Sequence, residues 1–100
     1  MRVVFAPRAE RQLDHLFNFL VTRAGEVRAA AYLDRVIAFC LRLEHFPERG
    51  TRRDEIRPGL RTIGFERRIT IAFTVSSDSV VILGVFYGGQ DYEAALRRGG

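Results

Sequence analysis

Arginine is the residue type in this chain whose chemistry is most conspicuous, because it supplies all the strong positive charge. The sequence has 16 basic residues against 12 acidic ones, a formal net charge of +4, and no Lys. Guanidinium groups bind carboxylates and phosphates through paired hydrogen bonds. Within twenty residues the sequence places Arg49, Arg52, Arg53, Arg57, Arg61, Arg67 and Arg68. As a group they predict a surface for an acidic partner. Taken singly, each Arg is typical of a solvated strand or turn. A genomic preference for Arg codons also accounts for the missing Lys.

Residues that support metal, cofactor or covalent chemistry are sparse. Cys40 lies on an apolar helical stripe, as a small core residue does, rather than in the setting of a nucleophile. A single cysteine excludes an intrachain disulfide framework and leaves no zinc cluster to build. No Gly-rich phosphate loop and no Ser/His/Asp set appears. We therefore expect neither a metal nor a cofactor.

Length and composition indicate one globular domain. The chain has 100 residues, of which 47% are hydrophobic and 28% charged, which suits one compact core over residues 1–100. A lone cysteine fits a reducing compartment, and no segment approaches the roughly 18 apolar residues of a membrane span. We expect a cytoplasmic protein without membrane contact.

The stretch from Pro58 to Gly89 predicts the sheet that positions the Arg cluster. From residue 69 to 75, apolar residues alternate with Thr and Ala, the period of two of a strand with one buried face. Residues 80–87 are apolar at almost every position, which favours an interior strand. A less regular strand over 60–65 comes first, and Glu66-Arg67 connects it to the second.

Two helices precede the sheet. Apolar residues at helical spacing predict a helix from Pro7 to Ala24, ended by Gly25. A second helix is predicted from Glu26 to about His45, before Pro47. The connection between them is so short that they should form an antiparallel hairpin. The two histidines of the chain belong to this helical part, away from the expected open face of the sheet.

The order of these elements predicts a two-layer α+β domain. It would have an N-terminal edge strand over residues 3–5, the helical hairpin on one sheet face and a three-stranded antiparallel meander. We expect the last strand to lie between the middle strand of the meander and the edge strand. Residues 47–58 read as loop and polar connection, and the tail over 90–98 as one or two helical turns capped by Asp91.

This order, with several local landmarks, resembles the RelE/ParE superfamily of bacterial type II toxin-antitoxin toxins over nearly the whole chain. The landmarks are Ala6-Pro7 before a helix with Ala9 and Leu13, the segment Leu43 to Gly50, Pro58-Gly59-Leu60-Arg61, the strand Ile69 to Phe73, and the ending Val85 to Asp91. Their order and spacing lean toward the ParE-like branch. Members of that branch often end the last strand with a His-Gly-x-Arg-Asp-like segment, in which this chain has Tyr87 for the His and Gln90 for the Arg.

The resemblance implies a growth-inhibiting toxin that a cognate antitoxin neutralises by wrapping its surface. ParE-like members act on DNA gyrase, whereas RelE-like members cut mRNA on the ribosome. Three hypotheses follow for this chain. The first is a gyrase-binding toxin without an active site, the second is a metal-independent, ribosome-dependent mRNA endoribonuclease, and the third is a degenerate family member that only binds its antitoxin.

The hypotheses assign different roles to the same side chains. The partner-binding set is Arg57, Arg61, Arg67, Arg68, Tyr87, Gln90 and Tyr92, and the first hypothesis has no catalytic residue. The nuclease alternative makes Arg61, Arg68 and Tyr87 catalytic, since RNA cleavage needs a base, an acid and cations for the phosphate. Tyr, with a usual pKa of about 10, is a poor general base. That property favours the binding hypothesis.

Overall fold

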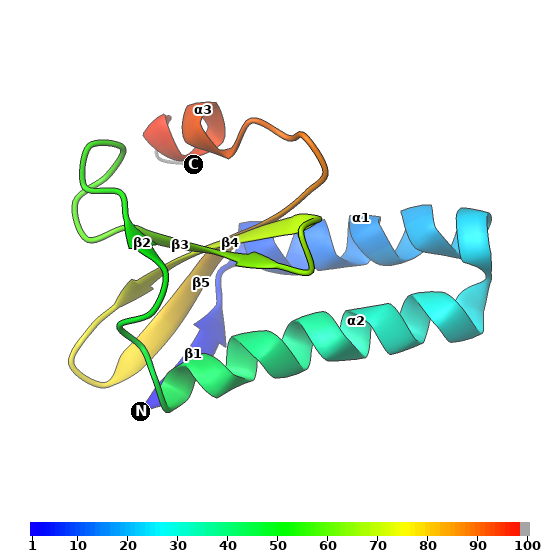
Figure 1. Ribbon diagram of the computed structural model, residues 1–100, viewed down its shortest axis with the longest axis horizontal. Helices are drawn as coiled ribbons and strands as arrows, with labels where there is room; N and C mark the ends of the chain where they lie inside the picture. Colours follow the sequence, from blue (N-terminus) through cyan, green and yellow to red (C-terminus); the bar gives the residue numbers. More distant parts are fainter. Residues whose placement is uncertain (99–100) are drawn as a thin grey trace.

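In the computed structural model, which describes residues 1–98, one mixed sheet separates a long helical hairpin from a short C-terminal helix (Figure 1). The strand order is β1-β5-β4-β3-β2. Along the chain the elements are β1 (Arg2–Phe5), α1 (Pro7–Ala24), α2 (Glu26–Leu41), the 3₁₀ turn η1 (Arg42–Glu44), β2 (Thr51–Arg52), β3 (Arg61–Phe65), β4 (Ile69–Val75), β5 (Ser79–Tyr87) and α3 (Tyr92–Arg97). The predicted α+β class and antiparallel meander are confirmed, and β5 lies between β4 and β1, to which it runs parallel.

A proline and a glycine set the bounds of the first helix of the hairpin. Pro7 opens α1 at a position where no backbone N–H is needed. Gly25 ends α1 with a φ of 87°, a left-handed value that favours glycine, and its N–H donates to the carbonyl of Val21 at 2.9 Å. The hairpin extends well past the end of the sheet (Figure 1). Its far end, around the turn at Gly25, therefore has no strand beneath it.

The second helix is shorter than predicted. Its α-helical part ends at Leu41, and a 3₁₀ turn continues to Glu44, where the prediction placed regular helix to about His45. The tighter turn directs Leu43 into the core, where it is 1% exposed. An apolar pattern of so few residues does not distinguish an α-helical turn from a 3₁₀ turn, which explains the error.

A fifth strand forms where a loop was predicted. Thr51 and Arg52 pair with Thr62 and Arg61 on β3 and make a short sheet edge. Both β2 residues are exposed and polar, so no alternation marks the strand in the sequence. Gly50 lets the chain approach this closely, because a side chain there would meet the backbone of Thr62.

The core fills both sides of the central strands. The helices bury Leu16, Leu33 and Val36 against the face of β4 that carries Ile71 and Phe73. On the other face, α3 covers a smaller cluster of Ile56, Leu60, Ala72, Phe86 and Leu96. Asp91 caps α3 as predicted, accepting from the Ala94 N–H at 3.0 Å. The tail thus closes the second face, which explains why β5 is apolar on both sides.

Among residues 1–98, no helix combines the length and the apolar character needed to cross a bilayer.

Candidate functional site

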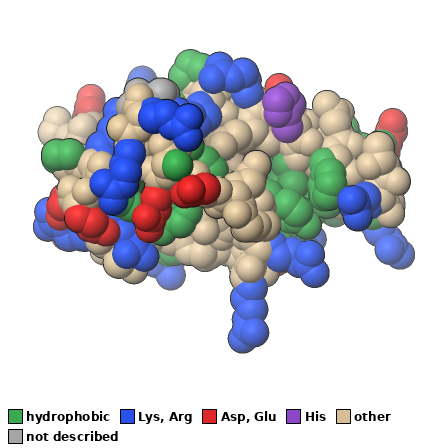
Figure 2. Space-filling view, turned by 90° about the horizontal axis from the view of Figure 1, so that it is seen from above, with side chains coloured by type: hydrophobic (Ala, Val, Ile, Leu, Met, Phe, Trp, Pro, Cys, Tyr) green, Lys and Arg blue, Asp and Glu red, His purple; other side chains and the backbone are tan. Residues whose placement is uncertain are grey.

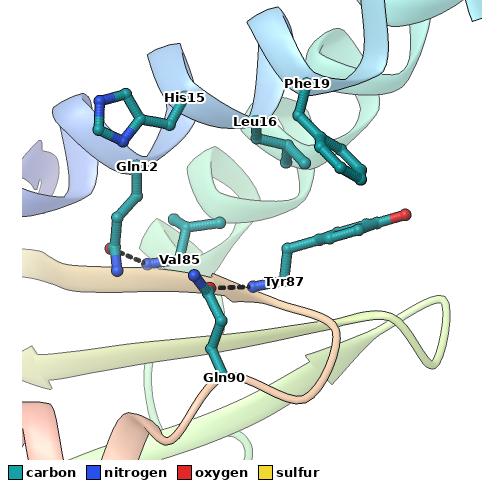
Figure 3. A pocket seen from close by; sticks show the side chains of 7 residues that line it. All are labelled: Gln12, His15, Leu16, Phe19, Val85, Tyr87 and Gln90. Carbon is teal, nitrogen blue, oxygen red and sulfur yellow. Dashed lines mark hydrogen bonds between the residues drawn. The ribbon is translucent and has the colours of Figure 1, made fainter. Parts of the chain in front are cut away.

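Two hollows meet at Tyr87, where β5 ends beneath the overhanging part of the helical hairpin. The first, of about 380 Å³, opens between α1 and β5. Its lining, drawn in Figure 3, is Gln12, His15, Leu16, Phe19, Val85, Tyr87 and Gln90. The second, of about 370 Å³, is called the Tyr32 cleft below. It is lined by Leu20, Ala24, Arg28, Ala29, Ala31, Tyr32, Arg35, Arg68 and Tyr87.

Aromatic side chains form the wall between the two hollows. The rings of Phe19 and Tyr87 lie 5.8 Å apart in a tilted arrangement, and the Arg23 guanidinium carbon lies 4.5 Å from the centre of the Phe19 ring. Phe19 remains 41% exposed. Large exposed aromatic rings beside arginine are typical of the anchors of protein interfaces.

Two glutamines fix the end of β5 from either side. A β-bulge at Leu83 shifts the register with β4, so that Ala72 pairs with Gly84 but Phe73 pairs with Ile82. Beside the bulge, the Val85 N–H donates to Gln12 Oε1 at 2.7 Å. The Tyr87 N–H donates to Gln90 Oε1 at 2.8 Å (Figure 3). Gln90, predicted to bind a partner, thus also holds the strand end that carries Tyr87.

The β3–β4 hairpin is tied to α2 by an ion pair. Both oxygens of Glu66 accept from the Arg35 guanidinium at 3.1 Å, and this hydrogen bonding holds the pKa of the Glu66 carboxyl below its usual value. Glu66 and Arg67 have positive φ values of 49° and 62°, which non-glycine residues rarely adopt. The turn places Arg67 in solvent and Arg68 on the rim of the Tyr32 cleft.

Tyr32 has an unusual hydroxyl. The oxygen is buried and has no hydrogen-bond partner within the described chain. Burial raises the pKa of the phenol, and the nearby Glu66 carboxylate and Tyr87 raise it further against the opposing charges of Arg35 and Arg68. The phenol is thus a protonated donor at neutral pH, without an acceptor.

The predicted site residues fall into separate groups. We call the surface around the two hollows, where the helical hairpin extends past the end of β5, the overhang. Four of the predicted residues lie there: Arg67, Arg68, Tyr87 and Gln90. The Gly88 N–H donates to the Arg68 carbonyl at 2.8 Å and joins the two segments. Arg61 pairs with Phe73, four residues along β4 from the pair of Ile69 with Tyr87. That spacing corresponds to about 13 Å along a strand. The structure therefore brings Arg68 and Tyr87 together but leaves Arg61 apart from them.

The remaining two residues lie elsewhere. Arg57 belongs to the β2–β3 loop and forms no ion pair among residues 1–98. Its neighbours are paired, Arg52 with Asp54 at 3.0 Å and Arg53 with Glu55 at 3.8 Å. Figure 2 shows basic and acidic side chains interleaved over this loop region and α3. Tyr92 packs on Phe86 with ring centres 6.0 Å apart, within the second-face cluster.

Sequence reasoning missed several residues of the site. His15 was placed in the helical part, away from the open sheet face, and was given no functional role; it lines the first hollow together with Tyr87. The two rings lie toward opposite ends of that hollow (Figure 3). Its position three residues after Gln12 and four before Phe19 puts it on their helix face, which was a usable signal. Tyr32 and Arg35 gave no such signal, because their role depends on where the β3–β4 hairpin lies.

Within residues 1–98, no three His, Cys, Asp or Glu side chains gather closely enough to hold a metal ion.

Comparisons with known proteins agree with this architecture. Residues 3–92 match the profile of a family described as the ParE toxin of the type II toxin-antitoxin system parDE. The chain is 30% identical over 95 residues to Toxin ParE3 of Caulobacter vibrioides, covering 95% of this chain and 94% of that protein. A solved chain from the chromosomal ParDE system of P. aeruginosa superposes with a TM-score of 0.77 at 22% identity, over 88% of this chain and 96% of the other.

Proposed function

The chain belongs to the ParE toxin family of type II toxin-antitoxin systems, and from this premise we propose that a cognate antitoxin neutralises it by binding around Tyr87 and that it poisons DNA gyrase. The overhang is the observation that carries the antitoxin part. Two largely apolar hollows and an exposed aromatic ring lie there beside Arg68. Such a surface suits an acidic, amphipathic protein segment.

The charge distribution supports the overhang over the β2–β3 loop as the antitoxin surface. Among residues 1–98, Arg28, Arg67 and Arg68 at the overhang form no ion pair, whereas in the β2–β3 region Arg52 and Arg53 are paired with acids and Arg57 and Arg61 are not. An unpaired cation gains more from an incoming carboxylate than one already neutralised. Because Arg28 and Arg68 also line an apolar hollow, we expect an antitoxin to use them together with Arg67, rather than the unpaired arginines of the β2–β3 region.

The gyrase part of the proposal rests on family membership and on a binding mode without catalysis. The nuclease alternative requires Arg61, Arg68 and Tyr87 to act on one phosphate. The strand register separates Arg61 from the other two by about 13 Å. A toxin that acts by protein contact needs no such convergence.

Charge reversal separates the two groups of arginines. We expect the Arg67→Glu/Arg68→Glu variant to lose binding to the antitoxin encoded beside this chain by a large factor, on the order of a hundredfold or more, because two favourable contacts become repulsive. The Arg57→Glu/Arg61→Glu variant should bind within about threefold of the unaltered chain, since peripheral charges contribute little. Calorimetric titration measures both affinities.

Thermal unfolding of each variant serves as the control for folding. If both variants are folded and the Arg57/Arg61 variant loses more antitoxin affinity than the Arg67/Arg68 variant, the antitoxin surface lies at the β2–β3 loop. Failure of the unaltered chain to bind the antitoxin would reject the proposal as a whole.

A further inference from the structure

Tyr32 lines a cleft whose rim is basic, and its buried hydroxyl is a donor without an acceptor among the described residues. Buried polar atoms in folded proteins are almost always hydrogen-bonded, so an orphaned one calls for a partner or a function. Here the oxygen has no partner in the described chain. The ring itself is held by packing, with Phe65 at 6.3 Å between ring centres and the Arg35 guanidinium carbon 5.0 Å above the Tyr32 ring. The hydroxyl is therefore positioned rather than free to seek another acceptor.

The one carboxylate close to Tyr32 does not satisfy the hydroxyl. Glu66 influences the phenol electrostatically, yet both of its oxygens are engaged by the Arg35 guanidinium at 3.1 Å. Arg68 lines the cleft and forms no ion pair among residues 1–98. A cation and a hydrogen-bond donor thus both lack an anionic partner in the same cleft.

The walls of the cleft define what kind of anion fits. Leu20, Ala24, Ala29 and Ala31 make most of the lining apolar and leave a hollow of about 370 Å³, within the range of small-ligand pockets. Nucleic-acid phosphates bind exposed basic stripes, where many of them are neutralised together. Two cations of the lining, Arg28 and Arg68, form no ion pair among residues 1–98. An apolar hollow with so small a cationic group suits a carboxylate on an otherwise apolar segment better than a run of phosphates.

We propose that the Tyr32 cleft is a receptor for one Asp or Glu side chain of the antitoxin, with Tyr32 Oη donating to the carboxylate and the Arg68 guanidinium pairing with it. This inference rests on the proposed function and adds the residue-level basis of its specificity. Apolar residues next to that acid in the antitoxin would occupy the walls formed by Leu20 and Ala29. The neighbouring Arg35 engages both oxygens of Glu66. Because Tyr32 Oη is buried in the free chain, the side chains around it must shift for the carboxylate to reach it.

The decisive variant is Tyr32→Phe, because it removes the hydroxyl and keeps the packed ring. We expect it to weaken antitoxin binding about tenfold or more, as the loss of a hydrogen bond to a charged group does. The melting temperature of the free chain should stay unchanged or rise, since the hydroxyl has no partner to lose. A merely structural role for the hydroxyl predicts instead a lower melting temperature. Ser76→Ala, which removes a hydroxyl in the β4–β5 turn, is the control for binding.

A double-mutant cycle identifies the acid. Each Asp and Glu of the antitoxin is changed to Asn or Gln, one at a time, and titrated against the unaltered chain, Arg68→Gln and the control Arg49→Gln. We expect one acidic position at which the Arg68→Gln change no longer weakens binding. Additive effects at every acidic position would overturn the receptor.

The outcomes also distinguish the two proposals. An unaltered chain that does not bind the antitoxin rejects the proposed function itself. Normal antitoxin binding by both Tyr32→Phe and Arg68→Gln rejects the receptor alone. Binding of a 20-nucleotide single-stranded RNA that depends on Tyr32 and Arg68, without such dependence for the antitoxin, would assign the cleft to nucleic acid and overturn the inference.

Discussion

Single side chains hold the end of β5 in the position that the candidate site requires. The bulge at Leu83 breaks the regular pairing of β5 with β4. Gln12 supplies an acceptor for the Val85 N–H at 2.7 Å, and Gln90 supplies one for the Tyr87 N–H at 2.8 Å. Both hydrogen bonds orient the backbone that carries Tyr87.

These two glutamines should differ in their effect on stability. We expect Gln12→Ala to lower the free energy of unfolding by about 1–3 kcal/mol, because it leaves the Val85 N–H beside a packed strand without an acceptor. Gln90→Ala should cost about 0.5–1.5 kcal/mol, since water can replace the amide at this exposed site. Ala is the better helix former, so helix propensity does not explain a loss at position 12. Urea denaturation measures both, and equal losses would contradict this view of the bulge.

For single residues, the sequence indicated which side chains could bind a partner better than it indicated which of them lie together. Arg68 and Tyr87 were selected together and do line one cleft. Arg61 was selected with them because it lies on the first strand of the predicted meander, yet the register places it at the other end of that strand from the hairpin. Tyr32 went unnoticed because nothing along α2 indicates that the β3–β4 hairpin will place Glu66 and Arg68 beside it.

Among the elements, the β3–β4 hairpin is the one under backbone strain. Glu66 and Arg67 adopt left-handed conformations in which a side chain is unfavourable, and neither is the Asn, Asp or Gly that such turns prefer. The ion pair between Glu66 and Arg35 binds the turn to α2. Backbone strain that neighbouring contacts maintain is common at functional sites.

Relieving this strain should stabilise the hairpin. We expect Arg67→Gly to raise the free energy of unfolding by about 0.5–1 kcal/mol, because the left-handed penalty of a side chain exceeds the added chain entropy of glycine. Glu66→Gly is the matched comparison, and it should gain less because it also removes the contact with Arg35. The midpoints of urea denaturation report both changes. A destabilised Arg67→Gly would mean that the turn is not strained.

Periodicity predicted the elements that bury a face and failed for those that do not. The helix over Pro7–Ala24 and the strand over Ile69–Val75 agree with the structure residue for residue, since their apolar spacing is imposed by the core. The two-residue strand β2 buries neither of its side chains and so left no pattern. The bulge escaped prediction because β5 is apolar on both faces, which hides a shift in register.

The whole molecule separates two basic regions with different electrostatic character. Around the β2–β3 loop, Arg52 and Arg53 are paired with neighbouring acids, whereas Arg28 and Arg68 at the overhang line an apolar hollow without an ion pair among residues 1–98. The overhang exists because the helical hairpin is longer than the sheet that it covers (Figure 1). The spacing of apolar residues predicted both helices. It did not predict that the far end of the hairpin would extend past the sheet, because that depends on where the strands end.

The most direct test of the central claim is a supercoiling assay with purified DNA gyrase and the purified chain. We predict that the chain abolishes supercoiling and that cleaved DNA linked to gyrase accumulates, and that an equimolar amount of the antitoxin restores the activity. Unchanged supercoiling, at a concentration of folded chain that arrests growth when expressed in cells, would contradict the account and direct the search to another target.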